Sequence, residues 1–155
     1  GVIITEQDVP QGAWYLDGGR APVCFSVEAG QADLFLCSYL GIDLMVKGER
    51  NYRLLDATVE FYSSLPREGD IIRYEIKIEK FTRQNNTYLF FFSFKGFIGK
   101  NPLISMTNGC AGFFTKQEII NSGGIISTDK DKSVKSGRKT PDYRNLVPVF
   151  IETYE

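Results

Sequence analysis

The order of its apolar segments is the feature that most constrains how this chain can fold. One mostly apolar helix is expected over residues 27–40. Four segments with the apolar character of strands follow it, at 53–61, 72–78, 88–94 and 103–114. A single helix followed by strands predicts an α+β domain in which an antiparallel sheet wraps around one central helix.

Two residues mark the expected ends of that helix, and a third stands out inside it. Ser26 is placed to cap the start with its hydroxyl, and Gly41 is a natural stop. Apolar residues on several faces predict that the helix is buried nearly all round. Gly30 costs roughly 1 kcal/mol relative to alanine inside a helix. We therefore expect a close neighbour at Gly30, either backbone or substrate.

The expected strands differ in how they should be buried. Residues 72–78 alternate between apolar and charged side chains, which predicts a half-buried strand. Residues 88–94 are aromatic on both faces, so this strand should be buried on both sides or lie at an interface. As an exposed edge it would pair with a second unit. A first strand at 2–4 and a short helix at 116–121 complete the prediction.

Composition restricts the class of protein. The 155 residues suffice for one domain with a core, and the net charge of −1 gives no reason to expect nucleic acid or membrane as a partner. No segment has the length of a membrane span or the pattern of a signal peptide, so we expect a cytoplasmic protein. Cys24, Cys37 and Cys110 are expected to be reduced and buried. Without histidine or a CxxC pair, no metal site is expected.

The chain divides into two parts by composition. Residues 1–124 contain all the expected helices and strands and are predicted to form one domain. Beyond them the sequence becomes polar and charged, so residues 125–155 are expected to be a linker or tail. Within this tail, the apolar segment 146–151 either adds a strand or begins a junction with a following domain.

Four segments, at 17–23, 27–33, 38–41 and 66–70, follow one another over about a hundred residues with a recognisable spacing. Together they resemble the hotdog-fold β-hydroxyacyl-carrier-protein dehydratases, most of all the dehydratase-type domains of polyunsaturated-fatty-acid and polyketide synthases. The resemblance implies a hotdog fold paired as a double hotdog, with a second copy or a neighbouring hotdog domain. It also implies a substrate carried on the phosphopantetheine of an acyl carrier protein, and no cofactor.

The resemblance also implies candidate catalytic positions. In the family, a loop histidine takes the α-proton and a helix carboxylate protonates the leaving hydroxyl. Aligning the Pro-Val step before the helix implies that Asp17 stands where the histidine belongs. The same spacing places Gln31 at or next to the acid position, with Glu28 and Asp33 as further candidates for the acid. Aspartate is a poor base near neutral pH, and glutamine has no carboxylic proton to donate.

A substrate pocket is implied along the loop and the first half of the helix. In the family, backbone N–H groups at the helix start hold the thioester carbonyl, where the helix dipole favours negative charge. The residues placed in this pocket are Arg20, Pro22, Val23, Ser26, Val27 and Gly30.

Each catalytic candidate also has a purely structural interpretation. Asp17 precedes two glycines and suits a turn. Glu28 suits the first turn of a helix, where carboxylates favour the dipole. Gln31 either bonds within the helix packing or lines a pocket. Asp33 is expected to face solvent or an interface rather than to act in catalysis.

Three functions follow from these alternatives. The first is a dehydratase-family domain without its own histidine, acting as the structural half of a double hotdog. The second is a hotdog thioesterase that uses Glu28 or Asp33 as base or nucleophile. The third is a non-catalytic module that binds an acyl chain or a protein. A carboxylate pointing into a tunnel would favour the second, and a filled core would favour the third.

Overall fold

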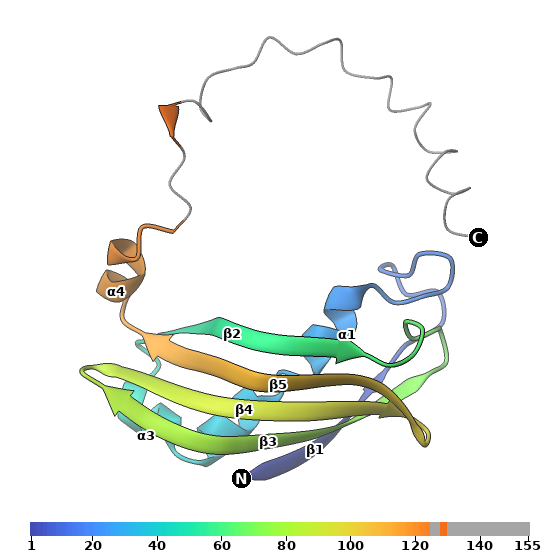
Figure 1. Ribbon diagram of the computed structural model, residues 1–155, viewed down its shortest axis with the longest axis horizontal. Helices are drawn as coiled ribbons and strands as arrows, with labels where there is room; N and C mark the ends of the chain where they lie inside the picture. Colours follow the sequence, from blue (N-terminus) through green and yellow to red (C-terminus); the bar gives the residue numbers. More distant parts are fainter. Residues whose placement is uncertain (125–127, 130–155) are drawn as a thin grey trace. The chain divides into compact units, whose positions relative to one another are not determined.

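The computed structural model describes residues 1–124 together with residues 128 and 129. Five strands form one antiparallel sheet in the order β1-β3-β4-β5-β2, and helices α1 and α3 lie on one of its faces (Figure 1). The strands are β1 (Val2–Asp8), β2 (Asn51–Phe61), β3 (Ile71–Gln84), β4 (Thr87–Ile98) and β5 (Asn101–Phe114). The helices are α1 (Val23–Ala29), α2 (Asp33–Tyr39), α3 (Ile42–Val46) and α4 (Lys116–Asn121). This arrangement confirms the predicted α+β class.

The predicted strands are all present, and so are the first strand and the short helix α4. Gly1–Ser122 forms one compact unit. The predicted tail at 125–155, including the candidate strand at 146–151, lies outside the described residues except for 128 and 129. The domain boundary after residue 124 therefore stays a prediction.

The central helix is broken rather than continuous. It begins at Val23, with Pro22 as the cap, because a proline loses no intrahelical bond at a helix start. Ser26 is consequently a buried residue inside α1 and not its cap, so that prediction is wrong. α1 ends at Gly30, and α2 restarts at Asp33. Gly41 follows α2 with a φ of 100°, a left-handed conformation that suits glycine, and so it ends the helix as predicted.

The helices are buried on one side only, which corrects the prediction of burial nearly all round. α2 buries Asp33, Leu36 and Cys37. On the same helix, Phe35 is 73% exposed and Tyr39 is 89% exposed. A single sheet covers only the face of the helix that packs on it, so the outer face stays open to solvent.

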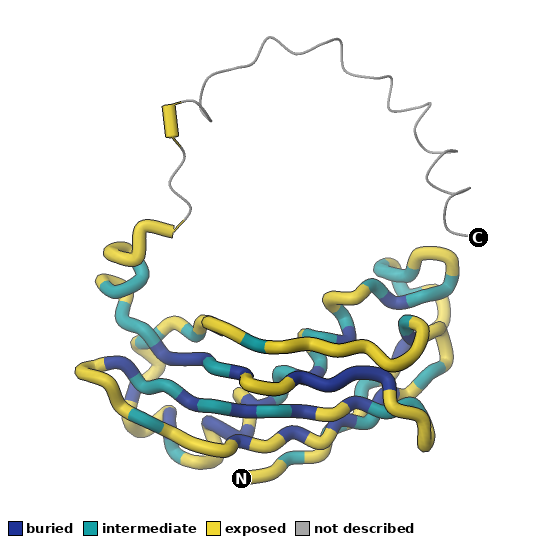
Figure 2. The backbone as a smooth tube through the Cα atoms, viewed as in Figure 1, coloured by how far each residue is buried: buried dark blue, intermediate teal, exposed yellow. Residues whose placement is uncertain are grey.

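The core lies between this helix layer and the central strands of the sheet. The alternating apolar residues of β3 are at most 4% exposed, which confirms the predicted half-buried strand. β4 contributes a second row from its inner face, and the buried stretches of the central strands appear dark blue in Figure 2. The two rows are Ile72, Tyr74, Ile76 and Ile78 from β3, and Phe90, Phe92 and Phe94 from β4.

The topology overturns one expectation about the sheet edge. β4 pairs with β3 on one side and with β5 on the other, so residues 88–94 are central and not an exposed edge. Their inner aromatic side chains are explained by burial against the helices. The edges are β1 and β2, because each of these strands has only one neighbour in the sheet.

β2 carries an uncovered apolar strip. Val59 pairs with the buried Met106, and Phe61 pairs with the buried Ile104, so both lie on the face that carries the helices. They are nevertheless 38% and 36% exposed. We call the exposed apolar residues of this strand the β2 strip: Leu54, Leu55, Val59 and Phe61. The helix layer reaches β2 at Tyr52, which bonds to Gln31, but it leaves Val59 and Phe61 exposed.

The cysteines only partly match the prediction. All three are free thiols, and Cys37 is fully buried. Cys24 is exposed because α1 begins four residues earlier than expected and presents its first turn to solvent. Cys110 is partly exposed on β5.

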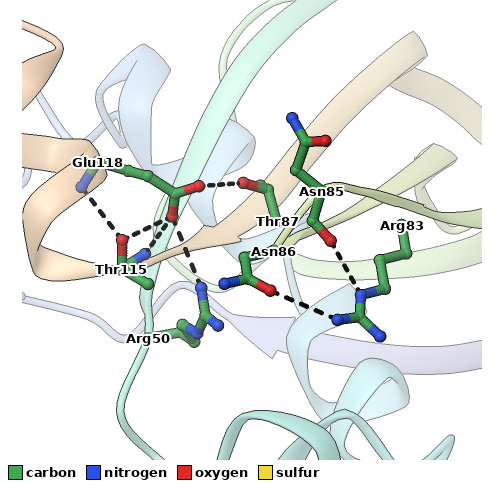
Figure 3. Close-up of polar contacts among 7 residues, drawn as sticks. All are labelled: Arg50, Arg83, Asn85, Asn86, Thr87, Thr115 and Glu118. Atoms are coloured by element: carbon green, nitrogen blue, oxygen red, sulfur yellow. Dashed lines mark hydrogen bonds and ion pairs between the residues drawn. The ribbon is translucent and has the colours of Figure 1, made fainter.

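Helix α4 is attached to the sheet through Glu118 (Figure 3). Thr115 and Glu118 form a reciprocal capping box at the start of α4. The Thr87 hydroxyl donates to the Glu118 carboxylate over 2.5 Å, and Arg50 lies 3.6 Å from the same group. Hydrogen bonds from Thr87 and Thr115, with a smaller contribution from Arg50, lower the pKa of Glu118 to about 2. This carboxylate therefore stays charged and keeps these contacts down to acidic pH.

Candidate functional site

Asp17 stands at the corner of a tight turn. Its backbone N–H donates to the carbonyl of Arg20 over 3.0 Å, and the Arg20 N–H donates back over 2.9 Å. Gly18 and Gly19 lie between them with φ values of 55° and 74°, which match a two-residue turn that glycine adopts without strain. The Asp17 side chain is exposed. The turn alone accounts for its place in the sequence, and a catalytic role stays a prediction.

Arg20 anchors this loop to the segment before β3. Its guanidinium donates to the carbonyl of Leu65 over 3.1 Å, and the next residue, Ala21, donates its N–H to the carbonyl of Pro66 over 2.8 Å. Pro22 then caps α1, and Val23 is 52% exposed. The guanidinium is thus used to hold the loop in place.

The core-facing row of the broken helix brings three predicted residues together. Ser26 and Gly30 lie four residues apart on one face of α1, Asp33 opens α2 after the break, and all three are buried. Tyr74 of β3 donates its hydroxyl to the carbonyl of Ser26 over 2.8 Å. Phe94 of β4 lies directly beneath Gly30. Val27, on a neighbouring face, is partly buried and packs against the core.

Asp33 is the most unusual of these groups. It is fully buried, and neither carboxylate oxygen has a hydrogen-bond partner among the described residues. Asp33 was predicted to face either solvent or an interface. The solvent-facing alternative is wrong, because α2 begins with Asp33 turned toward the sheet. Burial raises the pKa of Asp33 to about 7, and the dipole of its own backbone N–H offsets only part of this. Near neutral pH the carboxyl can therefore hold or release a proton.

Cys37 and Tyr52 interact with the charge of Asp33, and Tyr52 also bonds to Gln31. Tyr52 of β2 donates its hydroxyl to the amide oxygen of Gln31 over 3.0 Å, so the Gln31 side chain is engaged in packing. Burial raises the pKa of the Cys37 thiol to about 12, and the negative charge of Asp33 makes a smaller contribution in the same direction. Burial also raises the pKa of Tyr52, and Asp33, Cys37 and Glu28 add to that shift. Both neighbours of the carboxyl are thus neutral at ordinary pH.

Glu28 lies apart from this buried group. It is exposed, and because α1 begins at Val23 it belongs to the last turn of that helix. The interpretation that placed it in the first turn is therefore wrong. Among the catalytic candidates, only Asp33 is an ionisable group inside the core.

The aromatic partners of the helix were not predicted as site residues. Phe94 and Tyr74 pack edge to face, with ring centroids 5.7 Å apart. Tyr52 packs against Phe90 and Phe113 at the other end of the core. The inner-face spacing of β4 and the glycine in the helix were the available signals for the contact with Phe94. Nothing in the sequence pairs Tyr52 with Gln31.

A cavity of about 640 Å³ is lined by residues of all five strands, and none of the predicted site residues is among them. Its walls include charged side chains, among them Glu75, Lys77 and Lys95, that alternate along β3 and β4 with the buried rows.

No helix among the described residues is long and apolar enough to cross a membrane. The part of the chain that the structure describes also holds no cluster of three or more side chains suited to a metal ion.

Comparison with known proteins gives one sequence relative and many structural ones. The chain is 37% identical over 136 residues to a subunit of the polyunsaturated fatty acid synthase of a Thraustochytrium species. The match covers 86% of this chain but only 9% of that protein. No family model matches the chain.

Solved structures of thioesterases share the fold. A probable thioesterase from Bartonella henselae matches with a TM-score of 0.58 at 10% identity, over 75% of this chain and 92% of that one. A 1,4-dihydroxy-2-naphthoyl-CoA thioesterase from Synechocystis matches with a TM-score of 0.52 at 14% identity, over 73% and 81%. At these identities the likeness concerns the fold alone, and it confirms the predicted hotdog architecture.

Proposed function

Because the chain belongs to the same family as a segment of the Thraustochytrium polyunsaturated fatty acid synthase and has the hotdog fold, we propose that it is a dehydratase-like domain of such a synthase. In this proposal the domain is the structural half of a double hotdog and does not dehydrate β-hydroxyacyl thioesters by itself. Its substrate context is an acyl chain on the phosphopantetheine of an acyl carrier protein, with no cofactor. The relationship to the synthase segment is the observation that carries the proposal.

The residues found at the two candidate catalytic positions support the proposal that this domain is the inactive half of a double hotdog. The chain contains no histidine, and Asp17, which the resemblance places at the histidine position, is an exposed turn residue. Gln31, which the resemblance places at or next to the acid position, accepts a hydrogen bond from Tyr52 and has no carboxylic proton to give to a leaving hydroxyl. A homodimer would not restore the base, since a second copy also lacks histidine.

We expect the isolated domain to form no measurable enoyl product from a β-hydroxyacyl-pantetheine substrate. A general acid and a general base each supply about 10²–10⁴-fold in rate, and both are replaced here. Asp17→His, alone and with Gln31→Asp, should be assayed beside the wild type. Gain of turnover in the double variant would support the family alignment of these two positions.

A thioesterase is the second candidate, and Asp33 is the observation that favours it. A buried carboxyl with a pKa of about 7 is suited to accept a proton or attack a thioester at neutral pH. The same assay should therefore follow thiol release as well as enoyl formation. Robust hydrolysis by the wild type, abolished by Asp33→Asn and retained by Glu28→Gln, would replace the dehydratase-like proposal with this one.

Pairing of two hotdog units is the proposed role of the β2 strip. β2 is an edge strand of 11 residues, and two residues of the strip, Val59 and Phe61, lie on the side of the sheet that carries the helices. A partner strand added there would continue the sheet and cover those residues. The unit across the edge is either a second copy or a neighbouring hotdog domain of the synthase.

We expect Val59→Lys to weaken self-association by more than about 100-fold, because an unpaired charge buried in an interface costs several kcal/mol. Sedimentation of the domain over a range of concentrations measures this. Ile4→Lys is the matched control, since Ile4 is a 56% exposed residue on β1, the opposite edge. Equal dimerisation by the wild type and Val59→Lys would exclude β2 as the interface.

A further inference from the structure

Phe94 fills the space beneath the break in the central helix. A Cβ atom added to Gly30 would lie only 2.4 Å from Cζ of the Phe94 ring and 2.6 Å from both Cε atoms. The ring is therefore in direct contact with the helix backbone. Phe94 is 2% exposed, and Tyr74 supports the ring from the side. A hydrocarbon chain needs about 4 Å between its carbon atoms and their neighbours, so none can pass between Gly30 and this ring.

Two polar groups on either side of Gly30 have no partner. The hydroxyl of Ser26 and the carboxyl of Asp33 are fully buried, and both remain without a hydrogen bond among the described residues. Buried polar groups are normally satisfied by protein, water or ligand. Ser26 lies close to the Phe94 ring, because its carbonyl accepts a hydrogen bond from Tyr74, which packs against Phe94. Asp33 opens α2 on the far side of the break. The helix thus presents one unused hydroxyl, that of Ser26, close to the space that the ring occupies.

We propose that Phe94 closes this domain to acyl chains and determines that the unit does not bind its own substrate. The inference rests on the proposed function, because it takes an acyl thioester as the ligand in question. Removal of the ring opens an apolar cavity under Gly30. The hydroxyl of Ser26 is then free to donate a hydrogen bond to the oxygen of a thioester. Phe94 is a specificity-determining residue in this scheme and takes no part in chemistry.

The test is the binding of radiolabelled dodecanoyl-pantetheine by equilibrium dialysis to the wild type and to Phe94→Ala. We expect Phe94→Ala to bind at least about tenfold more tightly, the effect of burying two or more methylene groups. Phe92→Ala is the matched control, because Phe92 is 1% exposed on the same strand and face but does not lie under Gly30. It should bind no better than the wild type.

Folding is checked by circular dichroism and denaturant titration, since truncating a buried phenylalanine is costly. Phe94→Leu removes less volume, and it decides the question if Phe94→Ala does not fold. Its affinity should lie between those of the wild type and Phe94→Ala. Adding Ser26→Ala to the variant that folds should weaken binding several-fold, the loss of one hydrogen bond.

Three results would overturn the inference. The first is that the wild type binds dodecanoyl-pantetheine as tightly as the Phe94 variants do. The second is that Phe92→Ala binds it as tightly as Phe94→Ala. The third is that no folded Phe94 variant binds it. Binding is measured without turnover, so this test is separable from that of the proposed function. Dehydration by the wild type would overturn the proposed function, whereas equal binding without dehydration would overturn only the role of Phe94.

Discussion

Relative to the wild type, Asp33→Asn should become more stable by roughly 4 kcal/mol between about pH 4 and about pH 8. The buried carboxyl has a folded-state pKa of about 7, against an ordinary value of 3.8. Below the ordinary value the group is neutral in both folded and unfolded protein. As the pH rises, the unfolded chain loses the proton first, so the wild type loses stability progressively until the pH passes about 7. Asparagine does not ionise, so the variant avoids this loss.

Chemical denaturation at a series of pH values measures the effect. Only the change with pH is predicted, because a buried amide has its own unsatisfied groups and shifts the whole curve by a constant. Asp17→Asn is the control: it removes an exposed carboxylate and leaves Asp33 in place, so its profile should keep the shape of the wild-type profile. Parallel curves for Asp33→Asn and the wild type would show that folding does not raise the pKa of Asp33.

Gly30→Ala should destabilise the domain by about 3 kcal/mol or more, or prevent it from folding. Helix propensity alone favours alanine over glycine by about 1 kcal/mol. The clash is the larger effect, because the new Cβ would lie 2.4 Å from the Phe94 ring, and the ring is enclosed by the core. Thermal and denaturant unfolding of the purified variant measure the loss.

A double-mutant cycle isolates the cause. In a Phe94→Leu background the ring is gone, so adding Gly30→Ala should cost much less than it does in the wild type. An equal cost in both backgrounds would place the strain elsewhere in the helix. A neutral or stabilising Gly30→Ala in the wild type would mean that the ring moves away freely, which would also weaken the argument that Phe94 closes the interior.

The sequence predicted the elements well because their signals are local. The alternation of 72–78 identified the inner face of β3, and the short helix predicted at 116–121 has the same bounds in the structure, as α4. The glycine inside the helix correctly indicated a close neighbour, although that neighbour is the side chain of Phe94 rather than backbone or substrate. The break in the helix was missed, since Glu28, Ala29, Gln31 and Ala32 on either side of Gly30 are all good helix formers.

By itself, the sequence determined the order of helix and strands, the buried face of β3 and the lack of any imidazole base. Each of these depends on residue identity or on a period of a few residues. The tertiary structure alone decided that β4 is central, that β2 is an edge with an uncovered apolar strip, and that Asp33 is buried with no hydrogen-bond partner among the described residues. Strand order depends on pairings between distant residues, and several orders bury the same apolar faces. The environment of a carboxyl likewise depends on which distant side chains pack around it, and no local pattern encodes that.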